Sequence, residues 1–182
     1  MLYLDRFSED LSEFEKRIDY LAELGITYVH FMPLLKSREG NNDGGYAVAD
    51  YLMVDEKFGT MDQLERVMKL LKKRGIRTCI DFVLNHTAKE HIWAKECLKG
   101  NPDYADMYFM FDDDSIPKEY EKTLTEIFPG VAPGNFTYYP ELNKYVMTRF
   151  YEFQWDLNYG NPQVFNKIVE SKPHPISSWH LA

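Results

Sequence analysis

The sequence has few cysteines, no long apolar run and no excess of positive charge. Two cysteines among 182 residues, Cys79 and Cys97, are too few for a disulfide framework and suit a reducing compartment. No stretch of about 18 apolar residues could span a membrane, and the segment from Met1 to Asp5 lacks the basic and apolar regions of a signal peptide. A formal net charge of −8 disfavours binding to nucleic-acid phosphates. We therefore expect a cytoplasmic protein with no membrane partner and no nucleic-acid partner.

Several motifs of catalysis and metal binding are also missing. The sequence has no Gly-x-Gly-x-x-Gly, no P-loop and no Gly-x-Ser-x-Gly elbow. The spacing of His86 and His91 differs from the His-Glu-x-x-His zinc motif, and the acidic run 112–114 lacks the glycine and the spacing of an EF-hand loop. We therefore expect no metal site. Aromatic residues are the abundant class, at 15%, and they either fill a core or offer apolar faces to sugar rings.

The first half of the chain alternates between strand-like and helix-like segments. Residues 2–4, 26–32 and 76–84 are β-rich, whereas residues 11–21 carry apolar side chains at helical spacing. Thr60 and Gln63 form a capping box that begins a second amphipathic helix, which continues to Gly75. Short connections in this order predict right-handed crossovers and a parallel sheet. The pattern predicts an α/β fold, but it does not separate a closed barrel from an open doubly wound sheet.

The alternation stops after His86. Residues 88–98 fit a short helix, and residues 100–153 combine prolines, acids and aromatics without regular periodicity. A segment of that length is more than a loop, so we expect a small inserted domain. Pro162 to Val169 should begin another helix, which the prolines of 171–182 cannot extend. We therefore divide the chain into three βα units over 1–99, an inserted domain over 100–157, and the start of a further unit with a divergent tail over 158–182.

The end of the third predicted strand carries the most informative polar residues. Asp81 lies within an apolar run, where a carboxylate must be paired, and strand alternation places Phe82 and Leu84 on the face opposite Asp81. His86 follows at the strand end, where α/β folds place ligand-binding groups. Taken alone, Asp81 could be a member of a structural ion pair and His86 a hydrogen-bonded loop residue. His30 is most simply a hydrogen-bonded core residue.

Several strings resemble the α-amylase superfamily of glycoside hydrolases, in the form found in amylosucrases. Residues 81–86, Asp-Phe-Val-Leu-Asn-His, are similar to the signature region at the end of barrel strand three. Residues 43–51, Asp-Gly-Gly-Tyr-Ala-Val-Ala-Asp-Tyr, are similar to the loop after strand two, and 123–129 and 153–159 resemble parts of the domain inserted after strand three. The resemblance runs in order over about residues 2–169. It implies a partial TIM (β/α)8 barrel, comprising the first three βα units, with an inserted irregular B domain after strand 3.

The resemblance also implies a reaction and the residues of a substrate site. The reaction is the retaining transfer of glucosyl units from sucrose to α-1,4-glucan, with sucrose and α-glucan as binding partners and no cofactor. By carry-over, His86 hydrogen-bonds the glucosyl unit, Tyr46 stacks against it, and Asp43 pairs with an arginine to close the far end of the pocket. Phe150 and Gln154 face the donor from the end of the inserted domain. Asp81, as a buried orienting group, and Asn85 are structural residues of the same site.

The sequence departs from the family at the residues that perform catalysis. Retaining enzymes use two carboxyl groups about 5–5.5 Å apart, and the family supplies them after strands four and five. The matching sequence stops near Glu170, and no arginine follows Arg149 to pair with Asp43 or Asp81. We therefore expect no catalytic set in this chain, no glucosyl transfer by it, and a need for the complementing remainder of the barrel for a stable fold. Two alternatives remain open: a piece of a general α-glucosidase, α-amylase-type enzyme or sucrose hydrolase, and a non-catalytic remnant that binds sugar weakly.

Overall fold

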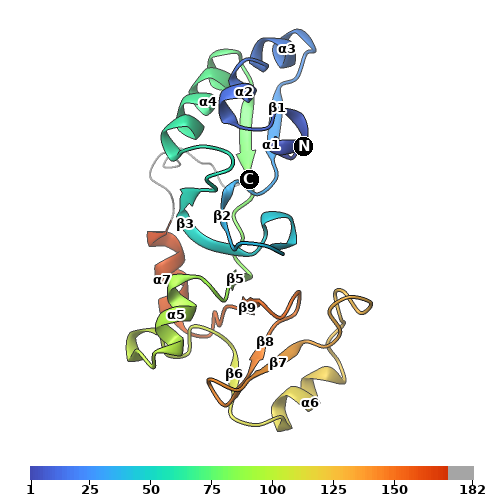
Figure 1. Ribbon diagram of the computed structural model, residues 1–182, viewed down its shortest axis with the longest axis vertical. Helices are drawn as coiled ribbons and strands as arrows, with labels where there is room; N and C mark the ends of the chain where they lie inside the picture. Colours follow the sequence, from blue (N-terminus) through green and yellow to red (C-terminus); the bar gives the residue numbers. More distant parts are fainter. Residues whose placement is uncertain (172–182) are drawn as a thin grey trace.

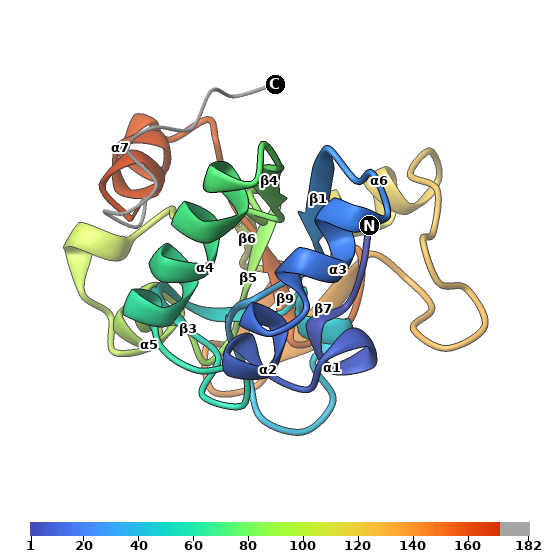
Figure 2. The same ribbon diagram turned by 90° about the horizontal axis from the view of Figure 1, so that it is seen from above.

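A parallel strand pair organises the N-terminal part of the chain. The computed structural model describes residues 1–171 (Figure 1, Figure 2). Strand β1 (Tyr28–Phe31) pairs in parallel with β4 (Arg77–Ile80), and Leu2 adds one parallel bridge to Phe31. The helices α1 (Leu4–Phe7), α2 (Leu11–Glu15) and α3 (Ile18–Glu23) precede β1, and α4 (Met61–Lys73) precedes β4. This arrangement confirms the α/β expectation, with parallel strands connected through helices.

Helix α4 begins and packs as its sequence predicts. The Thr60 hydroxyl accepts a hydrogen bond from the Gln63 N–H at 3.2 Å, and the Gln63 side chain accepts one from the Thr60 N–H at 2.8 Å. Its buried residues Leu64, Val67 and Leu71 join an apolar cluster with side chains of α2, α3, β1 and β4. These elements lie together at one end of the molecule in Figure 1. The apolar stripe of α4 therefore supplies much of the first core.

Two N-terminal predictions are wrong in detail. Residues 2–4 do not form a strand, because only Leu2 makes a bridge and Leu4 begins α1 with its side chain fully buried. The helix expected over 11–21 is divided, since the backbone at Arg17 (φ −101°, ψ 0°) leaves the helical region between α2 and α3. Phe14 and Ile18 are buried on either side of this break, so the apolar pattern correctly predicted burial but not continuity.

The third predicted strand, 76–84, is also shorter than expected. Strand β4 ends at Ile80, and the carbonyl groups of Val83 and Leu84 accept hydrogen bonds from side chains. The Tyr51 hydroxyl donates to the Val83 carbonyl at 2.7 Å, and the Tyr159 hydroxyl donates to the Leu84 carbonyl at 2.7 Å. Strict strand alternation therefore fails after Asp81: Leu84 is exposed, whereas Val83 packs on a second apolar cluster.

Short antiparallel strands connect the two ends of the molecule. Strand β2 (Leu35–Ser37) pairs with β3 (Val48–Val54), and β5 (His86–Ala88) pairs with β9 (Gln154–Asp156). The register of the second pair sets His86 opposite Asp156 and Ala88 opposite Gln154. Figure 1 shows β5 and β9 side by side beneath the β2–β3 pair. Strands β5 and β9 have three residues each, which is too short to show the alternation of apolar and polar residues by which a strand is predicted. The sequence therefore did not predict them.

The inserted segment forms a small sheet of its own. Strands β6 (Met110–Phe111), β8 (Lys144–Met147) and β7 (Phe136–Tyr139) are antiparallel in that spatial order, and α6 (Ser115–Glu121) packs beside them through Phe111, Tyr120 and Phe136. The 3-10 turn η2 (Pro102–Tyr104) leads into this segment from α5 (Ile92–Leu98). A second apolar cluster contains buried side chains from both 35–94 and 107–168. The domain boundaries proposed from the sequence remain predictions.

The last described helix is α7 (Pro162–Glu170), and it confirms the helix expected from Pro162. Its Val164 and Ile168 are buried in the second cluster. The tail expected to diverge from Ser171 onward lies, after that residue, outside the described residues. Within 1–171, no helix combines the length and the apolar character needed to cross a membrane.

Candidate functional site

Most of the predicted site residues meet around one cavity. A cavity of about 410 Å³ opens where β4 ends and β5 begins, below the loop that follows β2. Its walls include six of the residues predicted from the sequence together with four others: Asp43, Tyr46, Asp81, Asn85, His86 and Phe150, with Phe82, Val83, Leu84 and Phe128. The structure therefore brings together side chains that are up to 107 positions apart in the numbering, from Asp43 to Phe150.

The loop that carries Asp43 and Tyr46 has an unusual backbone. Asp43, Gly44 and Gly45, which form the 3-10 turn η1, all have positive φ (54°, 65° and 96°). A side chain at Gly45 would bring a Cβ to 3.0 Å from the Pro33 Cβ, so the position requires glycine. The Asn42 side chain accepts from the Gly45 N–H at 3.2 Å and closes the turn. The two glycines thus allow the chain to present Asp43 and Tyr46 to the same cavity.

His86, Gln154 and Asp43 form a polar network in which His86 and Gln154 are buried and Asp43 is partly exposed. The Gln154 side-chain oxygen accepts from the Tyr151 N–H at 3.0 Å, which fixes the amide orientation. Its Nε2 donates to Asp43 Oδ2 at 3.1 Å and lies 3.0 Å from His86 Nε2. Gln154 is fully buried and does not line the cavity itself, so it acts on the cavity through Asp43 and His86. The sequence predicted these three residues, but not that Gln154 would lie behind the other two.

Burial determines the protonation of this network. Burial lowers the pKa of His86 to about 4, although a hydrogen bond to the Tyr46 carbonyl opposes the shift. The imidazole is therefore neutral at pH 7, and its Nε2 has a partner in either tautomer: the Tyr46 carbonyl at 3.2 Å or the Gln154 amide. Burial raises the pKa of the Asp43 carboxyl, and the hydrogen bond from Gln154 opposes that rise. Within residues 1–171, Asp43 bonds the Gln154 side chain. The arginine that the resemblance implies for Asp43 was not expected from this chain.

The Asp81 carboxylate bonds two residues, His30 and Tyr46, and does not form a buried ion pair with a single partner. His30 Nε2 lies 2.6 Å from Asp81 Oδ1, and the Tyr46 hydroxyl donates to Asp81 Oδ2 at 2.8 Å. Asp81 is half-buried, not buried as predicted, because β4 ends before it and the side chain borders the cavity. Burial raises the pKa of the Tyr46 phenol, and the hydrogen bond to Asp81 adds to the effect. His30 is hydrogen-bonded, as expected, but it belongs to the surroundings of the site and not to the core.

The buried carboxyl of Asp156 lies on the strand that pairs with β5. It faces His86 across the β5–β9 pair, and burial raises its pKa to about 6, although a hydrogen bond from the predicted site residue Asn85 and the backbone N–H and charge of Arg149 oppose the rise. The sequence analysis did not single out Asp156, although it stands in the string 153–159, because its partners come from two other segments, Asn85–His86 and Arg149. Asn85 also places its Nδ2 3.3 Å from His86 Nδ1, so it contacts both residues.

Two aromatic rings from the inserted segment complete the wall. Phe150 lies 4.8 Å from the His86 ring, between centroids, and Phe128 lies 6.1 Å from Phe150. Phe150 was predicted, whereas Phe128 was missed, although it stands in the amylosucrase-like string 123–129. Both rings line the cavity and offer apolar surface there.

A second cavity, of about 390 Å³, lies on the other side of Phe150. It is bordered by Asn41, Thr137, Thr148, Tyr151, Glu152 and Phe153, among others. The Thr137 and Thr148 hydroxyls bond each other at 2.7 Å, and the Phe153 ring is covered by the Arg38 guanidinium and by a parallel Tyr151 ring. Its polar and aromatic groups are therefore largely occupied by one another. Among residues 1–171, no group of three or more His, Cys, Asp or Glu side chains could hold a metal ion.

Comparison with known proteins identifies relatives over most of the chain. The family model "Alpha amylase, catalytic domain" matches residues 7–179. The chain is 33% identical over 164 residues to a trehalose synthase of Pimelobacter sp. (strain R48), covering 89% of this chain and 27% of the relative. It is 33% identical over 154 residues to an oligo-1,6-glucosidase of Parageobacillus thermoglucosidasius, covering 85% and 26%.

Solved structures give the same relationship. A mutant of the trehalulose synthase MutB of Pseudomonas mesoacidophila MX-45, in complex with the substrate sucrose, matches with a TM-score of 0.76 and 32% identity, covering 89% of this chain and 28% of that one. The chain thus spans about a quarter of the length of the relatives that it matches. These relatives favour the general α-glucosidase-type alternative over the amylosucrase interpretation. The chain belongs to the alpha-amylase family and comprises part of its mixed α/β catalytic domain.

Proposed function

We propose that this chain supplies the glucosyl-binding wall of an enzyme that acts on α-glucosides, of the α-glucosidase, sucrose isomerase or trehalose synthase type. The carrying observation is the cavity that combines the carboxylate of Asp43 and the imidazole of His86 with the rings of Tyr46, Phe128 and Phe150. A pyranose ring has hydroxyls around its edge and C–H groups on its faces, so it needs polar groups beside apolar ring surfaces. The match to a sucrose-bound relative over 89% of this chain supports the proposal.

Each residue has a role that follows from its contacts. Asp43 and His86 line the cavity and offer hydrogen bonds to sugar hydroxyls, while Tyr46 and Phe150 border the ring faces. Gln154 positions Asp43 and His86 from behind, through its two contacts. Asp81 holds the Tyr46 ring through the hydroxyl, and Asn85 supports His86. In the (β/α)8 barrel that we propose for the whole catalytic domain, these groups form one side of the pocket.

We propose binding without turnover for the 182-residue chain itself. Retention needs a nucleophile and an acid/base, and each must be free to reach the substrate. The two carboxylates that line the cavity already have partners, since Asp43 accepts from Gln154 and Asp81 is held between His30 and Tyr46. Catalysis would therefore require carboxylates from the part of the catalytic domain that these residues do not include.

Amylosucrase-type transfer from sucrose is the second candidate. The string Asp43-Gly44-Gly45-Tyr46-Ala47-Val48 favours it, because the turn sets Asp43 where it closes one end of the cavity. The two candidates differ in products. Co-expression of this chain with the complementary part of a relative, followed by incubation with sucrose, would give isomerised or hydrolysed disaccharide in the first case and α-1,4-glucan in the second.

The direct test of the proposal is a titration of the chain with methyl α-D-glucopyranoside, followed by NMR of the labelled protein. We expect saturable shifts at Tyr46, His86 and Phe150, weaker binding of the β-anomer, and at least about tenfold weaker binding in Asp43→Asn, since a charge-assisted hydrogen bond is lost. Asp103→Asn, at an exposed turn away from the cavity, is the matched control and should bind as the parent does. Equal affinity of the Asp43→Asn and parent chains, or shifts spread over the surface, would contradict the assignment.

A further inference from the structure

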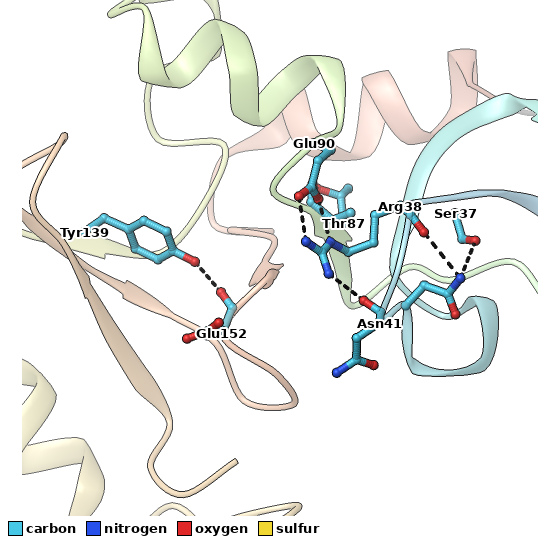
Figure 3. Close-up of polar contacts among 9 residues, drawn as sticks. Ser37, Arg38, Asn41, Thr87, Glu90, Tyr139 and Glu152 are labelled. Carbon is cyan, nitrogen blue, oxygen red and sulfur yellow. Dashed lines mark hydrogen bonds and ion pairs between the residues drawn. The ribbon is translucent and has the colours of Figure 1, made fainter. Parts of the chain in front are cut away.

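Arg38 lies where three segments of the site come together, and nothing in the sequence pattern marks it. Its side chain is 18% exposed, and it follows β2 directly. Figure 3 shows the guanidinium between Glu90, which follows β5, and the backbone of Asn41, in the loop before η1. Its third neighbour is Phe153, the residue before β9. Arg38 thus contacts the loop, the β5 end and the β9 end at once.

The contacts use most of the donors of the guanidinium. Arg38 Nε donates to Glu90 Oε2 at 2.9 Å and one terminal nitrogen donates to Glu90 Oε1 at 3.0 Å, which is a bidentate pair. The other terminal nitrogen donates to the Asn41 carbonyl at 2.5 Å. The planar group lies 4.3 Å from the centroid of the Phe153 ring, in cation–π geometry. Lysine could not reproduce this planar, forked arrangement.

Each partner of Arg38 lies close in sequence to one member of the polar network. Asn41 precedes Asp43 by two residues, Glu90 follows His86 by four, and Phe153 immediately precedes Gln154. A further tie, from the Tyr139 hydroxyl to the Glu152 carbonyl, holds the approach to β9 (Figure 3). We propose that Arg38 is a positioning residue: it locks the three segments so that Gln154 meets Asp43 and His86 at hydrogen-bonding distance. The effect that we expect on sugar affinity rests on the proposed function, whereas the effect on the network does not.

Burial separates this pair from the ordinary surface ion pairs of the chain. Exposed pairs contribute little, because water and ions screen them. Arg66–Glu15, which joins α4 to α2, has an Arg66 side chain that is 69% exposed and one contact at 2.7 Å. Arg38 pairs with Glu90 in bidentate geometry, donates to the Asn41 carbonyl and lies over the Phe153 ring, so it contacts three segments of the chain. Arg66 is therefore the matched control.

The test follows the Gln154 side-chain amide in the 182-residue chain by NMR, in Arg38→Met, Arg38→Lys and Arg66→Met. The exchange of its protons with solvent reports directly on the hydrogen bonds to Asp43 and His86. A general loss of stability would not speed the exchange of these protons selectively. We expect solvent exchange of these protons to be at least about tenfold faster in Arg38→Met, intermediate in Arg38→Lys, and unchanged in Arg66→Met. An unchanged Gln154 signal in folded Arg38→Met overturns the proposal.

Two further readouts keep the outcomes distinct. If Arg38→Met does not fold, Glu90→Gln decides, because it is isosteric and leaves one acceptor: faster exchange at Gln154 supports the proposal, and no change overturns it. Affinity for methyl α-D-glucopyranoside should fall about tenfold in Arg38→Met. If the parent chain binds no sugar but Gln154 responds as predicted, the proposed function fails and the positioning role stands. If sugar affinity is unchanged although Gln154 exchanges faster, the positioning role at the sugar site is overturned.

Discussion

Replacement of His86 by asparagine should remove a specific part of the acid sensitivity of the fold. His86 is 3% exposed, and its folded-state pKa of about 4 lies below the ordinary value of 6.5. Between these two values the unfolded chain binds a proton that the folded chain does not. The contribution is therefore fully present above pH 6.5 and is lost as the pH falls toward 4. The Asn variant lacks this proton linkage.

The expected magnitude follows from the difference between the two pKa values. At about 1.4 kcal/mol per pH unit, the gap from 6.5 to about 4 corresponds to about 3 kcal/mol of unfolding free energy in full. At pH 5 about 2 kcal/mol of it is already lost. The variant will be less stable than the parent at pH 7, since it loses buried contacts, and the stability gap between the two should narrow by about 2 kcal/mol at pH 5.

The assay is urea unfolding at several pH values between 4 and 7.5, followed by tryptophan fluorescence, because Trp155 is fully buried in the second core. The matched control is Asp156→Asn. Burial raises the pKa of Asp156 from 3.8 to about 6, so its charged form destabilises the parent as the pH rises through that range. Relative to the parent, Asp156→Asn should gain stability from pH 4 to 6, the reverse of the trend for His86→Asn.

The reasoning would be refuted if the parent and His86→Asn curves ran parallel from pH 7 to 4. A constant gap would mean that His86 has the same pKa in the folded and unfolded chains, so it could not be buried and neutral. The unfolding free energies of His86→Asn and Asp156→Asn, each relative to the parent, should change with pH in opposite directions. A change in the same direction would equally contradict the electrostatic description of the site.

Three further predictions concern the backbone and the core. Gly45→Ala should lower the unfolding free energy more than Gly25→Ala, because both glycines have positive φ but of the two only Gly45 has a neighbour, Pro33, within reach of the added Cβ. In urea unfolding we expect a loss of about 1 kcal/mol for Gly25→Ala and of at least about 2 kcal/mol for Gly45→Ala. Equal losses would argue against the packed turn. Thr60→Ala should lower the unfolding free energy by about 1 kcal/mol through loss of the capping box, with no effect on sugar affinity. Leu71→Ala should cost about 2–5 kcal/mol as a core truncation, and a cost below about 1 kcal/mol would show that α4 does not pack as described.

Helices and the larger strands were predictable because their signals are local. The Thr60–Gln63 capping box and the apolar spacing of α4 are complete within one segment, and the structure has both. The run from 76 was correctly read as a parallel strand, but its end was not, since the hydroxyls that take over its carbonyl groups come from Tyr51 and Tyr159, far away in sequence. The composition of one segment does not show which residues from distant segments will bond to it in the folded chain.

The site was predictable as a set of residues but not as a network. Asp43, Tyr46, His86 and Phe150 came from resemblance, and the cavity assembles all four. The resemblance did not predict which of these residues contact one another. Gln154 lies behind the wall and bonds Asp43, His30 bonds Asp81, and Arg38 bonds Glu90. Each of these pairings joins residues at least 50 positions apart in sequence, so no single string contains it.

The family assignment was robust where the specific activity was not. The Asp-Gly-Gly-Tyr turn and the Asp-to-His string at 81–86 set the backbone geometry and the polar wall of the cavity. Relatives of this chain include a trehalose synthase, an oligo-1,6-glucosidase and a trehalulose synthase, so the two strings indicate the family without deciding among these activities.

The central claim is that the cavity between Asp43, His86 and Phe150 binds a glucosyl unit, and the most direct measurement is of intermolecular nuclear Overhauser effects. With methyl α-D-glucopyranoside added to the labelled chain, the account predicts contacts from the sugar ring protons to the Tyr46 and Phe150 rings, which border this cavity from opposite segments. The contacts should disappear on competition with sucrose. Sugar contacts that fall only on exposed aromatic residues such as Tyr20 or Tyr120, with none at Tyr46 or Phe150, would contradict the account.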